Sequence, residues 1–227
     1  HTLKDIMVWR EEELLATEIL ANILKGYGHF YMISRGRNVA TTETIFRLVF
    51  QPKMRKVYLS FPMSHVMDLP DTLAEIDRFK ADINKHFICF DPADVDEFIL
   101  HKMADEAVQA GKDEIEVPAS EGLIKLKTKD VIQISGDIMG QIYMRDFKMV
   151  DQADMIISLV PELPNGKPGL SSGVERELHH AFEGGKEVYV VWACRALPSP
   201  FITETATKVF HSTDEAIGHF KAKGYVT

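Results

Sequence analysis

Cysteine is scarce in this chain, which has only Cys89 and Cys194 among its 227 residues. Both lie in apolar runs, HFICF and VYVVWAC, and neither belongs to a CxxC pair. A disulfide framework or a structural zinc site needs several cysteines at characteristic spacings, so we expect neither here. We interpret both cysteines as thiols of the hydrophobic core.

Positive charge and long apolar runs are also scarce. The chain has 26 Lys and Arg against 34 Asp and Glu, a formal net charge of −8, and no Lys/Arg run longer than two. A nucleic-acid backbone or an anionic membrane surface would need a basic face, so we expect neither partner. No apolar run approaches the roughly 18 residues of a membrane span, and no signal-peptide pattern is seen, so we predict a cytoplasmic protein. The first residue, His1, is not Met, which is consistent with a fragment or a trimmed chain.

Two nucleotide-binding signatures, GxGxxG and GxxxxGK[ST], are absent, so dinucleotide and P-loop sites lack their main support. A metal site has little support either. Glu175 and His179 are four residues apart and could reach one ion from a helix, but a catalytic zinc needs a third protein ligand. We identify no such ligand. We therefore predict no metal and no other cofactor.

The sequence does contain a regular alternation of strand and helix patterns, and 45% of its residues are apolar. We expect strands at 29–35, 56–61, 87–90, 154–160, 187–193 and near Val209, a polar strand pair around 114–134, and helices at 8–25, 41–49, 71–86, 94–110, 140–152, 172–184 and 213–223. Several of the strands are apolar throughout, which is typical of a parallel sheet covered on both faces. The predicted fold is α/β: a doubly wound, mainly parallel, Rossmann-like or flavodoxin-like sheet.

Two parts of the chain are expected to lie outside the core of that fold. Residues 1–50 are interpreted as an N-terminal extension made of a helix, a strand and a helix. An alternative interpretation is that they form the tail of a larger upstream domain. Residues 51–227 are expected to form the main domain. The acidic segment 91–135 is interpreted as an insertion in it, serving as a lid or a dimer arm.

The stretch GLSSGVERELHHAF at 169–182 carries an unusual density of polar groups at the expected start of a helix. Ligands of parallel sheets bind beyond the carboxyl ends of strands, where this helix begins. Ser172 followed by Glu175 predicts a capping box, which explains Glu175 structurally. Glu177 has no such capping role.

Glu177 shares one helix face with Gly173 and Ala181, small residues that leave room for a ligand beside its carboxylate. A second carboxylate, Asp146, lies eight residues before Asp154, and the helix between them carries Asp146 to the same edge of the sheet. Asp154 is interpreted as a turn or cap residue. Two carboxylates near a helix N-terminus suit glycosyl transfer, in which one attacks an anomeric carbon and the other assists the leaving group.

In combination these residues resemble the nucleoside 2-deoxyribosyltransferase family, and most closely its nucleoside 5′-monophosphate N-glycosidase relatives, over roughly residues 56–195. The resemblance rests on Tyr58 in VYLSFPMS, on Asp146 before Ala153-Asp154, and on the G-x-x-x-E-x-x-x-A spacing of Gly173, Glu177 and Ala181. It implies that Glu177 is the nucleophile and that Asp146 positions the sugar or helps to protonate the base. It also implies that Tyr58 lies near Glu177 and the sugar.

Ser171, six residues before the expected nucleophile, distinguishes two branches of this family. Nucleoside transferases tend to carry Asp at this position, where it binds a free 5′-hydroxyl, and nucleotide hydrolases carry Ser, which binds a 5′-phosphate. The resemblance therefore implies a phosphate near Ser171, Ser172 and Gly173, where free N–H groups of the helix start favour an anion.

The loop after the first strand of the expected domain departs from the nucleotide hydrolases, which have a Gly-rich loop with an Arg. This chain has Ser60, Pro62, Ser64 and His65 there, and we include these four residues in the expected substrate-binding set.

The predicted function is hydrolysis of the N-glycosidic bond of a (deoxy)nucleoside 5′-monophosphate through a covalent glycosyl-Glu177 intermediate. Nucleoside 2-deoxyribosyl transfer and a non-catalytic nucleotide-sensing domain are the alternatives. The family resemblance further implies a homodimer or a larger homo-oligomer, because a neighbouring subunit helps to complete the site in that family. Light scattering at assay concentration tests this expectation, and a fully active monomer would contradict it.

Overall fold

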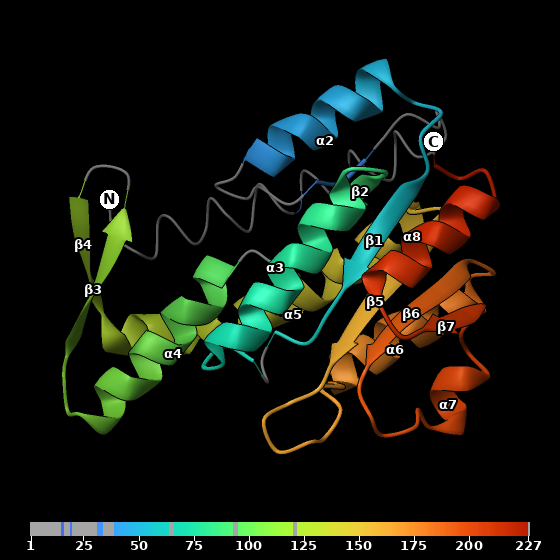
Figure 1. Ribbon diagram of the computed structural model, residues 1–227. Coiled ribbons are helices and arrows are strands. Elements are labelled where there is room, and N and C mark those ends of the chain that lie inside the picture. Colours follow the sequence, from blue (N-terminus) through green and yellow to red (C-terminus); the bar gives the residue numbers. More distant parts are fainter. Residues whose placement is uncertain are drawn as a thin grey trace. The chain divides into compact units, whose positions relative to one another are not determined.

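A computed structural model of the chain describes residues 15, 19, 31–33, 39–63, 66–92, 95–119 and 122–226 (Figure 1). The chain divides into two compact units. One comprises His1–Tyr31 and Asp94–Arg145, and the other comprises Met32–Ala93 and Asp146–Thr227. The expected extension 1–50 is thus divided between the units, and most of the segment 91–135 belongs to the first.

The second unit is built on a five-stranded parallel sheet with the strand order β2-β1-β5-β6-β7. The strands are β1 (Lys56–Ser60), β2 (Ile88–Phe90), β5 (Met155–Pro161), β6 (Glu187–Ala193) and β7 (Lys208–Phe210). This order is the flavodoxin-like one, in which the chain first extends the sheet on one side of β1 and then on the other. The predicted α/β fold class is confirmed.

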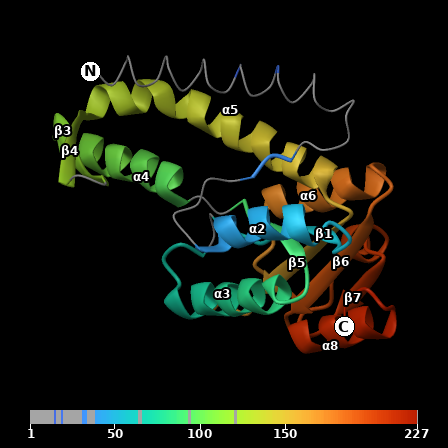
Figure 2. The ribbon, with the colours of Figure 1, turned by 90° about the horizontal axis from the view of Figure 1, so that it is seen from above.

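Helices cover both faces of this sheet (Figure 2). Helices α3 (Pro70–Asn84) and α8 (Thr213–Ala222) lie on one side, and α6 (Ser172–Glu183) lies on the other. Helix α2 (Val39–Phe50) lies against β2, where Thr44 Oγ1 donates to the Cys89 carbonyl at 3.2 Å. The short helix α7 (Pro200–Thr203) precedes β7.

The two faces of β1 and β5 carry different chemistry. Val57, Leu59 and Ile157 belong to a buried apolar cluster with residues of α3 and α8. Because successive side chains of a strand alternate between faces, the intervening residues Tyr58 and Ser60 face the side on which α6 lies. Polar side chains of β1 are thus directed toward α6.

The first unit contains α4 (Val95–Gln109), an antiparallel pair of β3 (Glu114–Ala119) and β4 (Gly122–Lys127), and the start of α5 (Thr128–Gln152), which continues into the second unit. The predicted strand pair is present but ends at Lys127. The predicted start of α5 near residue 140 is wrong by twelve residues. Residues 128–134, expected to belong to the polar strand pair, are helical instead, because local propensity is a weak prior that tertiary packing overrides.

The predicted helix 8–25 and strand 29–35 lie mostly outside the described residues, and residues 31–33 have no regular structure. No helix among the described residues is both long and apolar enough to cross a membrane.

Candidate functional site

Glu177 of α6 reaches across the sheet to β1. Tyr58 Oη donates to Glu177 Oε1 at 2.9 Å, and Ser60 Oγ donates to Oε2 at 2.6 Å. Tyr58 and Ser60 are fully buried, so their hydroxyl groups are held by the packed sheet. Each oxygen of the carboxylate therefore has its own fixed donor, and the plane of the carboxylate is set by two strand residues.

This carboxylate lies at the position where α/β sheets usually bind ligands. The chain order reverses between β1 and β5, which are neighbours in the sheet, and Ser60 is the last residue of β1. Ligands of open parallel sheets bind outside the carboxyl ends of the strands at such a switch point. Glu177 is therefore placed where a ligand is expected on topological grounds alone.

The pKa of Glu177 is raised to about 7, chiefly because burial removes the carboxylate from water. Hydrogen bonds from Ser60 and Tyr58 oppose the rise, and the negative charge of Asp146 adds to it. Asp146 is partly buried in the second-unit part of α5. A carboxyl group that titrates near neutral pH beside a second carboxylate is a candidate functional group.

The end of α5, which carries Asp146, packs against α6, which carries Glu177. The rings of Phe147 and His180 lie 4.7 Å apart, and His180 Nε2 lies 2.7 Å from Asp151 Oδ1. Of the three residues predicted to be catalytic, Tyr58 is hydrogen-bonded to Glu177, and Asp146 lies close enough for its charge to raise the pKa of Glu177.

Ser171 is the N-cap of α6. Its backbone is extended and its Oγ accepts a hydrogen bond from the Val174 N–H at 3.2 Å. The predicted capping box of Ser172 and Glu175 is therefore wrong by one residue, since Ser172 is already helical. Either serine could cap, and the earlier one allows an additional helical hydrogen bond, from the Glu175 N–H to the Ser171 carbonyl at 3.1 Å.

Ser172 and Gly173 are exposed at the first turn of α6. A Cβ added at Gly173 would meet only Ser171 Oγ, at 3.6 Å, so the space above this turn is open. Ala181, by contrast, is fully buried, so the room predicted beside it is filled by the protein. The open side of Glu177 is therefore the side toward the helix start.

The remaining predicted residues follow β1. Pro62 is buried just beyond the strand, while Ser64 and His65 lie outside the described residues.

Asp154 lies at the opposite end of the strands from the Glu177 carboxylate. Its Oδ2 accepts a hydrogen bond from the Lys56 N–H at 2.8 Å at the amino ends of β1 and β5, which fits the structural role predicted for Asp154.

Sequence reasoning missed Ser158. It is fully buried in β5, and its register partner in β1 is Ser60. The signal was present, since DMIISLV is an apolar strand interrupted by one hydroxyl. A single buried serine is common in strands, so the pattern alone gave no reason to select it.

Other chemistries have less support. In the part of the chain that the structure describes, no group of three or more His, Cys, Asp and Glu side chains could hold a metal ion. Burial raises the pKa of the Cys89 thiol, and that of Cys194 is raised to about 11. Both thiols are protonated at neutral pH and are poor nucleophiles.

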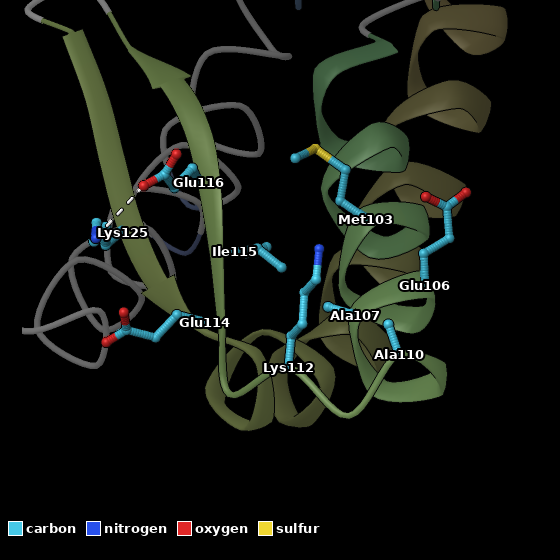
Figure 3. Close-up of a pocket in the computed structure, with 9 residues that line it drawn as sticks. All are labelled: Met103, Glu106, Ala107, Ala110, Lys112, Glu114, Ile115, Glu116 and Lys125. Atoms are coloured by element: carbon cyan, nitrogen blue, oxygen red, sulfur yellow. Dashed lines mark ion pairs between the residues drawn. The ribbon is translucent and has the colours of Figure 1, made fainter.

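Two hollows have linings that do not include Glu177. One of about 600 Å³ lies between α4 and β3, where Met103 and Ala107 face Ile115 and the Lys112 side chain extends into the space (Figure 3). Another, of about 680 Å³, is lined by residues of α6 and α7 with Thr205, including Ser172 at the helix start. Glu177 lines neither hollow, so we assign them no catalytic role.

The chain was compared with models of protein families and with curated protein sequences, and neither comparison gives a match.

Proposed function

We propose that the chain cleaves the N-glycosidic bond of a nucleoside 5′-monophosphate, with Glu177 as the nucleophile. The observation that carries this proposal is the Glu177 carboxylate, which two buried hydroxyl groups hold at the switch point of the sheet, within the electrostatic influence of Asp146. Any buried carboxylate needs hydrogen-bond donors, but a structural glutamate does not need a second carboxylate nearby. Glycosyl transfer through a covalent intermediate uses such a pair of carboxyl groups.

The proposed reaction has two steps. Ionised Glu177 attacks the anomeric carbon as the bond to the base breaks; the bonding electrons go to the base nitrogen, which receives a proton. Water then attacks the glycosyl ester, which restores the carboxylate. Tyr58 and Ser60 orient the carboxylate for the attack, and Asp146 assists the sugar or the departing base.

The direct test is to incubate the protein with a panel of ribonucleoside and deoxyribonucleoside 5′-monophosphates and to measure free base by chromatography. We expect base release from at least one of them. A second free base added to the reaction distinguishes the two enzymatic alternatives, because a transferase produces a new nucleoside or nucleotide and a hydrolase produces free sugar phosphate. No base release from any substrate would leave the proposal without support.

A 5′-phosphate is the part of the substrate that the start of α6 is suited to bind. The N–H groups of Ser172 and Gly173 open a twelve-residue helix, and Ser171 Oγ lies beside them. A charge-assisted contact of this kind contributes about 1.5 to 3 kcal/mol, or a preference of roughly tenfold to a hundredfold over the nucleoside.

We expect Ser171→Asp to erase that preference, because it places negative charge against the phosphate. Ser171→Asn is the matched control: both side chains cap helices well, so only the charge differs between the variants. The measurement is kcat/KM for nucleotide and nucleoside with each variant. If Ser171→Asp and Ser171→Asn lowered kcat/KM for the nucleotide equally, charge at this position would not matter and the phosphate would bind elsewhere.

A further inference from the structure

Ser158 is a buried hydroxyl without a hydrogen-bond partner. Its side chain has no exposed surface, and it is the one buried side-chain nitrogen or oxygen lacking a partner in the described part of the chain. An unsatisfied buried hydroxyl costs about 1 to 3 kcal/mol, so stability alone favours alanine at this position. Such a group calls for an explanation.

The position of Ser158 supplies that explanation. It is the register partner of Ser60, and adjacent strands lie about 4.8 Å apart. Ile157 and Leu159 belong to the cluster with α3 and α8, so Ser158 faces the opposite side, as Ser60 does. The unpartnered hydroxyl therefore lies next to the donor that holds Glu177.

Ser60 can accept a hydrogen bond as well as donate one. Its single hydroxyl hydrogen is given to Glu177 Oε2 at 2.6 Å, and the lone pairs of Ser60 Oγ can accept from another donor. Ser158, the register partner of Ser60 on the neighbouring strand, carries the hydroxyl that is available as that donor. Because Ser158 Oγ is wholly buried, it cannot touch a substrate and can act only through such a neighbour.

We propose that Ser158 is a positioning residue, whose hydroxyl donates to Ser60 Oγ when Glu177 is ionised and completes a hydrogen-bonded chain from Ser158 through Ser60 to Glu177. Hydrogen bonds in a chain polarise one another, so the bond from Ser158 to Ser60 strengthens the bond from Ser60 to Glu177. The catalytic meaning of this inference rests on the proposed function, because only a nucleophilic Glu177 needs its ionised form supported.

The chain of hydroxyls has a measurable consequence for the titration of Glu177. The titratable groups that act on it are Tyr58 from β1 and Asp146 from α5. Replacing Ser158 leaves both unchanged. Loss of the Ser158 hydroxyl destabilises the ionised carboxylate of Glu177. We therefore expect the substitution to raise the pKa of Glu177 further, by roughly half a unit.

The test follows the ¹³Cδ resonance of Glu177 by NMR across about pH 4 to 9, with Glu177→Gln used to assign the resonance. We expect Ser158→Ala to raise the pKa, Ser60→Ala to raise it more, and Ser158→Thr, which keeps the hydroxyl, to restore the wild-type value. An unchanged or lowered pKa in Ser158→Ala overturns the inference. So does a Thr variant that titrates like the Ala variant, and denaturation curves establish that each variant is folded.

This titration needs no substrate, so it separates the two proposals. If the wild type releases no base, the proposed function fails and the NMR measurement still decides the role of Ser158. If base is released, the acid limb of the kcat/KM profile in Ser158→Ala should move upward together with the pKa measured by NMR.

Discussion

Glu177→Gln is expected to reduce base release at least about a thousandfold, because an amide cannot form the glycosyl ester and water does not replace a positioned nucleophile at a comparable rate. Glu175→Gln is the matched control. Glu175 lies on the same helix two residues earlier, is exposed, and has no capping role in the structure. It should change kcat/KM by no more than about twofold, as is usual for exposed positions.

The pH profile then assigns the role of Glu177. With a pKa of about 7, a nucleophilic Glu177 loses activity as the pH falls through 7, since protonation removes the attacking carboxylate. A Glu177 that acts as the general acid gives the opposite limb, with activity lost above pH 7. Near-wild-type turnover of Glu177→Gln would exclude both roles.

The second large effect is on stability. The folded protein holds a proton on Glu177 up to about pH 7, whereas the unfolded chain releases it near the ordinary value of 4.5. The folded state therefore binds more protons in this window, and the free energy of unfolding falls as the pH rises through it. The shift corresponds to about 3 kcal/mol at pH values above 7.

Glu177→Gln should remove this pH-dependent cost, because glutamine stays neutral at every pH. We expect the variant to have a larger free energy of unfolding than the wild type. This difference should be about 1 to 3 kcal/mol larger at pH 8 than at pH 5. Urea denaturation at both pH values measures this double difference, in which the other titrating groups cancel. Glu175→Gln, at an exposed position of the same helix, is the control for removing one carboxylate from α6. Parallel pH dependence of the wild type and Glu177→Gln would mean that the carboxylate is not destabilised by burial.

These two effects have the same physical origin. The site keeps a carboxylate in surroundings that favour its neutral form, and two hydroxyl donors among the described residues, Tyr58 and Ser60, oppose the effect of burial. Functional groups are commonly kept in such unfavourable states at the expense of stability. A variant more stable and less active than the wild type would fit this pattern, and a variant that lost both would not.

The sequence by itself determined the class of the fold and the order along the chain of the five strands of the sheet. Apolar strands such as VYVVWA and DMIISLV are short and continuous, and amphipathic helices separate them, which is sufficient to predict a parallel sheet covered on both faces. The sequence also separated Glu177 from Glu175, although the reason it gave for Glu175 was wrong. Local hydrogen bonding favoured a serine cap at this helix start, but two adjacent serines satisfied the pattern equally.

Only the tertiary structure decided which side chains meet. The hydrogen bond between Tyr58 and Glu177 joins residues 119 positions apart, and it depends on the register of β1 against β5 and on the face that α6 covers. A shift of β1 by one residue would turn Tyr58 and Ser60 away from Glu177, because side chains alternate along a strand. Register and helix docking are set by packing of the whole sheet, so no local pattern could place Tyr58 and Ser60 against the carboxylate.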